Sequence, residues 1–138
     1  MLSPGISVNA PIAQMFRDQE KPVWSEIELA YQASKGRIAA ITGTNGKTTT
    51  TALTGEIMKG YYESSFVVGN IGIPYTSVAL DTKEDSVTTA EISSFQLETI
   101  VDFKPDVCAV LNITPDHLDR HGTVEVYAQT KESIGKTR

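Results

Sequence analysis

The stretch RIAAITGTNGKTTT, residues 37–50, decides the fold. Its first part, RIAAITG (37–43), is a short apolar run that ends in glycine, which is typical of a strand buried in a parallel sheet. The following residues, 44–60, predict a loop that leads into a helix. In such a strand–loop–helix unit, the backbone N–H groups of the loop and of the helix N-terminus converge where a phosphate chain binds.

The glycine-rich loop GTNGKT (43–48) carries side chains that suit a nucleotide. Lys47 is placed to reach the β- and γ-phosphates, and Thr48 offers a hydroxyl to Mg²⁺. The loop has the compact form G-x-x-G-K-[ST], because the first glycine of the longer G-x-x-x-x-G-K-[ST] pattern would fall at Ile41. The alternative is a plain glycine turn with an exposed lysine, but the order of strand, loop, Lys-Thr and helix favours phosphate binding.

The rest of the chain repeats the alternation of strand and helix. Further short apolar runs predict strands at 66–70, 86–93 and 106–113, separated or followed by predicted helices at 72–80, 95–100 and 123–136. Continuously apolar strands that alternate with helices predict an α/β fold. We expect a three-layer parallel sheet with helices on both faces, in a P-loop-type mononucleotide-binding domain.

The first 35 residues lack the strand–helix alternation of residues 36–138. They begin with a turn-rich, proline-containing stretch, continue with a predicted helix at 12–19, and then show a capping-box pattern in which Glu28 follows Ser25 by three positions. We therefore divide the chain into residues 1–35, the tail of a preceding domain with its linker, and residues 36–138, part of a nucleotide-binding domain. The last residues give no stop signal, so we expect a piece of a longer protein.

Composition excludes several classes of protein. The 138 residues carry 12 basic and 17 acidic side chains, a net charge of −5 without a basic cluster, which argues against nucleic-acid binding. The single cysteine, Cys108, excludes an intramolecular disulfide and a multi-cysteine zinc site. No apolar stretch approaches the ~20 residues of a membrane-spanning helix, and the N-terminus lacks a secretory pattern. We expect a cytoplasmic protein with no membrane partner.

Glu91 lies near the end of the predicted strand 86–93. Ligands of open α/β sheets bind at the carboxyl ends of the strands, and a carboxylate there can hold the Mg²⁺ that bridges nucleotide phosphates. The alternative is a glutamate that faces solvent or pairs with a lysine. The nearby phosphate loop favours the metal role.

The segment LNITPDHLDRHG (111–122) follows the last predicted strand at the same edge. Its polar core holds Asp116, His117, Asp119, Arg120 and His121 within six positions. Imidazoles and carboxylates in one loop could hold a divalent ion or steer a phosphate. The alternative is a polar surface loop in which Asp116 caps a helical turn.

Lys131 occupies an unexpected position in the predicted helix 123–136. It shares one helical stripe with Val124, Tyr127 and Ile134. A lysine there either extends its amine to solvent or is held inside a site, where burial lowers its pKa and frees the amine to add CO₂ as a carbamate. The pattern alone favours the extension to solvent.

These segments together resemble the Mur ligase family. The resemblance rests on ITGTNGKTTT, GNIGIP, AEISSFQLE, LNITPDHLDRHG and Y-x-x-x-K-x-x-I, which follow one another in the family's order. SPGI near the start and SSFQLE resemble the branch that uses D-glutamate. The resemblance implies a cytoplasmic enzyme, monomeric at full length, that uses ATP to add D-glutamate to UDP-N-acetylmuramoyl-L-alanine through an acyl phosphate in peptidoglycan precursor synthesis.

The resemblance also implies a role for individual residues. Lys47, His117 and Lys131 would be catalytic, and ATP would lie against Gly43, Thr44, Asn45, Gly46, Lys47, Thr48 and Thr49. Thr48 and Glu91 would hold one Mg²⁺, while His117 and a carbamylated Lys131 would hold a second. Asn70, Ser93 and Gln96 would contact the muramoyl substrate or the transferring phosphate. Ser3, Pro4 and Gly5 would contact the UDP-sugar side.

Three alternatives remain open. Family members are much longer and have a C-terminal domain that binds the amino acid, so we expect this chain to be an incomplete, inactive fragment of the ligase. Its parent could instead be another amino-acid ligase of the Mur and folylpolyglutamate synthase family. A stand-alone P-loop module would need Lys47, Thr48 and Glu91 but neither His117 nor Lys131. A non-catalytic remnant is the third possibility.

Overall fold

The computed structural model describes residues 1–70 and 72–135, with the backbone alone at positions 118 and 120. Its centre is a parallel sheet of four strands in the order β2-β3-β1-β4. The strands are β1 (Arg37–Thr42), β2 (Ser65–Gly69), β3 (Val87–Glu91) and β4 (Val107–Val110). The predicted parallel sheet is therefore confirmed, and its strands are mostly shorter than the apolar runs that predicted them.

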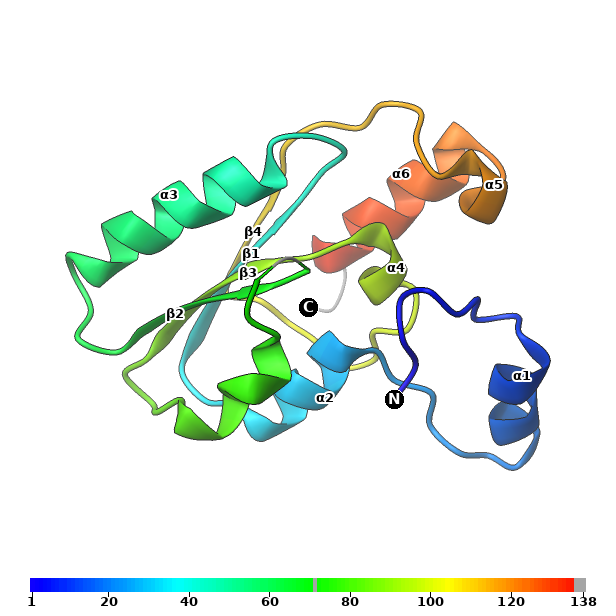
Figure 1. Ribbon diagram of the computed structural model, residues 1–138, viewed down its shortest axis with the longest axis horizontal. Coiled ribbons are helices and arrows are strands. Elements are labelled where there is room, and N and C mark those ends of the chain that lie inside the picture. The colour runs from blue at the N-terminus through cyan, green and yellow to red at the C-terminus, as the bar shows by residue number, and fades with distance from the viewer. Residues whose placement is uncertain (71, 136–138) are drawn as a thin grey trace.

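Helices cover both faces of the sheet, as predicted (Figure 1). On one face, α3 (Lys47–Lys59) packs against β1, β2 and β3. It approaches β2 so closely that a Cβ at Gly55 would lie 2.2 Å from Cγ2 of Val67. On the other face lies α2 (Glu26–Ala33), which packs against two short 3₁₀ turns. The phosphate-loop helix is thus held tightly against the sheet.

Three short helices gather beyond the carboxyl ends of the strands (Figure 1). They are α4 (Ser94–Leu97), α5 (Leu118–His121) and α6 (Val124–Glu132), and α6 packs against both of the others before ending in the 3₁₀ turn η3 (Ser133–Gly135). The N-terminal segment with α1 (Pro11–Asp18) lies to the side of α4. The edge of the sheet that binds ligands in α/β proteins is therefore enclosed by elements from distant parts of the chain.

The predicted helix at 72–80 is wrong. The segment forms two 3₁₀ turns, η1 (Tyr75–Ser77) and η2 (Ala79–Asp81), with bonds between residues three apart. The buried Tyr75 side chain and a hydrogen bond from the Thr76 N–H to Glu26 Oε1 hold the tighter turn. Tertiary contacts therefore override the local helical pattern. The predicted helix 123–136 likewise changes to η3 after position 132, and position 136 lies outside the described residues.

The predicted capping box of α2 is also wrong. Ser25 precedes the helix but makes no capping hydrogen bond with its side chain. Glu28 is instead fully buried, and its carboxylate accepts the N–H groups of Val101, Asp102 and Phe103. Burial alone would raise the pKa of Glu28, but these hydrogen bonds and one from the Gln32 amide bring the pKa below its usual value. The glutamate thus anchors the loop before β4 rather than the helix start.

The membrane prediction can be compared with the helices themselves. Among the residues that the structure describes, every helix is too short or too polar to cross a bilayer. This agrees with the absence of a long apolar run in the sequence.

The anchoring role of Glu28 predicts a loss of stability in Glu28→Gln. The amide retains one oxygen acceptor and turns an NH₂ group toward backbone donors, so we expect unfolding to become easier by about 2 kcal/mol or more. Urea unfolding followed by circular dichroism measures this. The exposed Glu63→Gln is the matched control.

The lowered pKa of Glu28 determines how its contribution to the free energy of unfolding depends on pH. It is fully present above the unfolded-state pKa of a glutamate, about 4.3, and is lost as the pH falls through the folded-state pKa. The stability difference between wild type and Glu28→Gln should therefore shrink in acid. A difference that stays constant down to acidic pH would contradict the assignment.

Candidate functional site

The loop after β1 presents unused amide groups at the start of α3. Gly46 precedes the helix with a φ of 82°, a left-handed conformation that glycine adopts without strain. The first N–H groups of a helix lack partners within the helix. Within the described part of the chain, the N–H groups of residues 46–49 meet no backbone or side-chain acceptor. Four amides are therefore free to bind an anion beside the positive end of the helix dipole.

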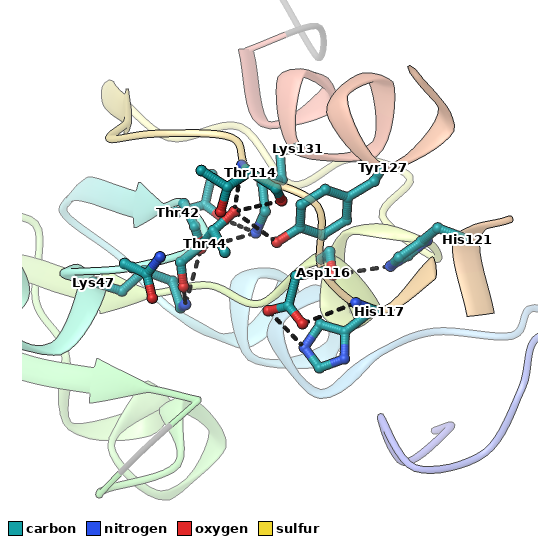
Figure 2. Close-up of polar contacts among 12 residues, drawn as sticks. Thr42, Thr44, Lys47, Thr114, Asp116, His117, His121, Tyr127 and Lys131 are labelled. Atoms are coloured by element: carbon teal, nitrogen blue, oxygen red, sulfur yellow. Dashed lines mark hydrogen bonds and ion pairs between the residues drawn. The ribbon is translucent and has the colours of Figure 1, made fainter. Parts of the chain in front are cut away.

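Two lysines share one carbonyl oxygen in this loop. Lys47 Nζ donates to the carbonyl oxygens of Gly43 at 2.9 Å and Thr44 at 3.0 Å, and Lys131 Nζ donates to the same Gly43 oxygen at 3.0 Å. Figure 2 shows Thr44 between Lys47 on one side and Lys131 on the other. Two ammonium groups that meet at one carbonyl create a local excess of positive charge, which an anion such as a phosphate would neutralise.

Lys131 is held inside the site. Only 2% of the residue is exposed, and Nζ lies 4.8 Å from the centroid of the Tyr127 ring. Burial, followed by repulsion from Lys47, lowers the pKa of Lys131 to about 8, although Asp116 opposes the shift. The expectation from the helical pattern alone, that this amine extends to solvent, is wrong. The helix stripe faces the site because α6 packs on α4 and α5 beyond the strand ends.

Glu91 ends β3 opposite the phosphate loop. It is 2% exposed, which rules out the solvent-facing alternative, and its Oε2 accepts a hydrogen bond of 2.9 Å from Thr48 Oγ1. Its other carboxylate oxygen, Oε1, is buried and has no partner among the described residues. A carboxylate oxygen without a partner beside a threonine hydroxyl fits a Mg²⁺ ion, which prefers oxygen ligands.

A small cavity joins the predicted catalytic residues. Its volume is about 100 Å³, and its lining includes the three predicted catalytic side chains: Lys47, His117 and Lys131. The predicted substrate residues Asn70 and Ser93 line it too, together with Ser94, Phe95, Asp116 and Tyr127. Residues from five separate segments thus surround one space.

The histidine loop reaches this cavity through His117. The His117 side chain is 48% exposed, and its Nε2 lies 3.5 Å from Asp116 Oδ2. Asp116 Oδ1 accepts the His117 backbone N–H, which precedes α5. His121 points elsewhere: it is buried, with Nε2 3.0 Å from Ser94 Oγ. No group of three His, Cys, Asp or Glu side chains placed to bind a metal occurs among the described residues.

The remaining predicted substrate residues lie in two places. Ser93 and Gln96 form the capping box of α4, in which Ser93 Oγ accepts the Gln96 N–H and Gln96 Oε1 accepts the Ser93 N–H. Pro4 and Gly5 line a wide, open cavity of about 520 Å³ that also borders on His117. Ser3 does not line it. Substrate contacts of these residues remain predictions.

Two residues that were not predicted as site residues, Tyr127 and Asn112, hydrogen-bond the phosphate loop. Tyr127 is buried on α6, and its hydroxyl shares a hydrogen bond of 3.1 Å with Thr44 Oγ1. Burial raises the pKa of the Tyr127 hydroxyl. Asn112 follows β4 and hydrogen-bonds the backbone of Asn45. The position of Tyr127 one helical turn before Lys131 could have indicated its place in the site. The hydrogen bonds of Asn112 could not be predicted without knowing how β4 pairs with β1.

Comparisons with known proteins agree with this geometry. The model of the Mur ligase middle domain matches residues 41–137. Two enzymes called UDP-N-acetylmuramoylalanine–D-glutamate ligase, from Lachnoclostridium phytofermentans and Lachnospira eligens, are 59% and 60% identical over the whole chain. The chain spans only 30% and 31% of their lengths. The crystal structure of MurF ligase from Thermotoga maritima in complex with ADP is 25% identical, with a TM-score of 0.57, over 79% of this chain and 28% of that one.

The burial of Lys131 and its proximity to Lys47 predict an unusually low pKa for its amine. Its ε-methylene NMR signal, assigned by its absence in Lys131→Met, should titrate near pH 8. In Lys47→Ala the midpoint should rise, because the repelling charge is removed. A midpoint at the ordinary lysine value of about 10.4 in wild type would contradict the burial and the repulsion.

The same shift predicts how stability depends on pH. Between pH 8 and the ordinary lysine value, the unfolded chain binds more protons at this position than the folded chain does. The contribution of Lys131 to the free energy of unfolding should therefore rise with pH across this range. Urea unfolding of wild type against Lys131→Met measures it, and a falling contribution would contradict the sign.

Proposed function

The chain belongs to the Mur ligase family, and on that premise we propose that it is the nucleotide-binding part of an ATP-dependent ligase that joins D-glutamate to UDP-N-acetylmuramoyl-L-alanine. The proposal rests on the N–H groups of residues 46–49, which have no acceptor among the described residues and lie beside two converging lysines. The similarity to D-glutamate ligases over the whole chain supports the choice of amino acid.

The reaction would begin with transfer of the γ-phosphoryl group of ATP to the substrate carboxylate. The amides of residues 46–49 would hold the terminal phosphates, and Lys47 would leave the carbonyls of Gly43 and Thr44 to neutralise their charge. The amine of D-glutamate would then attack the acyl phosphate and displace phosphate. Catalysis of this kind depends on positioning and on charge neutralisation, which the rigid loop on a buried strand supplies.

The residues present fit the metal ions that the family uses. Thr48 and Glu91 would hold one Mg²⁺, and the buried Glu91 Oε1 without a partner among the described residues supports that assignment. His117 and a carbamylated Lys131 would hold a second, and the lowered pKa of Lys131 makes the neutral amine available for CO₂. When bound, Mg²⁺ would offset the negative charge on the β- and γ-phosphates.

The substrate would approach from the side of α4. Asn70 and Ser93 border the cavity, and Gln96 supports Ser93, so they would contact the muramoyl substrate or the moving phosphate. Pro4 and Gly5, which line the open cavity beside His117, would face the UDP-sugar side together with Ser3. Residues 1–35 would be the end of the UDP-binding domain and its linker. The full-length enzyme would be a cytoplasmic monomer, and this chain alone would bind ATP without completing the reaction.

Nucleotide binding by this chain is the direct test. Isothermal titration calorimetry should detect saturable binding of Mg-ATP to wild type, weakened about 10- to 100-fold in Lys47→Ala, because a charge-assisted hydrogen bond is lost. Lys59→Ala, at the exposed end of the same helix, is the matched control and should bind like wild type. Equal binding by wild type and Lys47→Ala would sink the phosphate-loop assignment.

The ligase activity needs a test in the full-length protein. D-Glutamate-dependent release of phosphate should disappear in Lys131→Ala. If ATP hydrolysis proceeds without D-glutamate and survives that substitution, the protein is a nucleotide-binding module and not the ligase.

A further inference from the structure

The phosphate loop is attached to the segment that follows β4. The parallel pairing of β1 and β4 brings Thr42 opposite Val110, and it continues past both strands. The Leu111 N–H donates to the Thr42 carbonyl at 3.0 Å, and the Thr44 N–H donates to the Asn112 carbonyl at 3.1 Å. The first half of the loop is therefore an extension of the sheet.

The side chain of Asn112 extends this pairing by one more residue. Its Oδ1 accepts the Asn45 N–H at 2.8 Å, and its Nδ2 donates to the Asn45 carbonyl at 2.9 Å. One side-chain amide thus satisfies both backbone groups of Asn45, as a neighbouring strand would. Among the common side chains, only an amide offers a donor and an acceptor in this arrangement.

This pairing decides which loop amides remain for a ligand. The N–H groups of Thr44 and Asn45 are occupied by Asn112, whereas those of residues 46–49 have no acceptor in the described part of the chain. The loop is flanked by Gly43 and Gly46, both at positive φ, so it has little intrinsic preference for one conformation. The hydrogen bonds from Asn112 therefore hold the loop in one conformation, which its own sequence does not do.

Hydrogen bonds between Thr44 and Thr114 connect the phosphate loop to the histidine loop. Thr44 Oγ1 accepts the Thr114 N–H at 3.0 Å and donates to the Thr114 carbonyl at 3.3 Å. Figure 2 shows Thr114 beside Thr44, with Asp116 and His117 following on the same segment. The chain between Asn112 and His117 is short, so fixing its start beside the phosphate loop also places His117 relative to Lys47.

We propose that Asn112 is a positioning residue that pre-orders the phosphate loop and holds it in register with the histidine loop. The identity of the ligand as a nucleoside triphosphate rests on the proposed function, but the ordering of the loop does not. Asn112 is exposed and lies outside the hydrophobic core, so its replacement should disorder the loop and leave the fold intact.

The first test measures backbone amide exchange in Asn112→Ala, with the exposed Asn9→Ala as the matched control. Amides of Thr44 and Asn45 should exchange about tenfold faster or more in Asn112→Ala, with an unchanged unfolding midpoint. Asn9→Ala should match wild type. Unchanged exchange at Thr44 and Asn45 would overturn the proposal.

Asn112→Asp removes one of the two side-chain hydrogen bonds to Asn45, and it serves as the test if the alanine variant does not fold. The carboxylate keeps the acceptor for the Asn45 N–H but loses the donor to its carbonyl, so exchange at Asn45 should lie between wild type and Asn112→Ala. Exchange at Asn45 as fast as in an unfolded chain would overturn the role assigned to Oδ1.

The second test measures Mg-ATP affinity by calorimetry. Affinity should fall about tenfold in Asn112→Ala, because the ligand must then order the loop. It should fall further in Asn112→Asp, which adds a negative charge near the phosphates.

Faster amide exchange in Asn112→Ala without loss of affinity would overturn the role of Asn112 in nucleotide binding. Failure of wild type to bind Mg-ATP would refute the proposed function of this chain, while the exchange experiment would still decide the role of Asn112.

Discussion

The parallel pairing of β1 with β3 on one side and β4 on the other is the constraint on which the site depends. Because the three strands run in the same direction and in register, their carboxyl ends meet at one edge, where Ile41 lies opposite both Glu91 and Ala109. The phosphate loop, the Glu91 carboxylate and the segment that carries His117 therefore begin side by side. Packing of α3 on the sheet then places the N-terminus of this helix at the same edge (Figure 1).

Electrostatics gives this edge its chemical character. The ammonium groups of Lys47 and Lys131 meet at the Gly43 carbonyl, next to amides that carry partial positive charge. Glu91 accepts a hydrogen bond from Thr48 with one carboxylate oxygen, and its other oxygen has no partner among the described residues. Ammonium groups, loop amides and a carboxylate around the same loop suit a phosphate chain that carries a divalent cation. The low pKa of Lys131 results first from its burial and then from repulsion by the nearby Lys47.

The features that depend on local pattern could be predicted from the sequence. Apolar runs indicated the four parallel strands, and the order of Gly46, Lys47 and Thr48 after the first of them identified the loop. The predictions were wrong where contacts between residues far apart in the sequence determine the local structure. Glu28 accepts hydrogen bonds from the loop at 101–103 and does not cap α2. The burial of Tyr75 holds its segment in 3₁₀ turns and not in the predicted helix. Lys131 and Asn112 show the same limit, because the burial of one and the pairing of the other depend on how α6 and β4 are placed.

We infer that the amides of residues 46–49 are oriented for a phosphate before any ligand arrives. Titration of the ¹⁵N-labelled chain with Mg-ATP, followed by amide chemical shifts, tests this pre-ordering. The largest changes should occur at residues 46–49, with small changes at Thr44 and Asn45, whose amides are already bonded. Unchanged signals at residues 46–49, or changes centred instead on the apolar cavity lined by Leu2, Ile12 and Phe16, would contradict this inference.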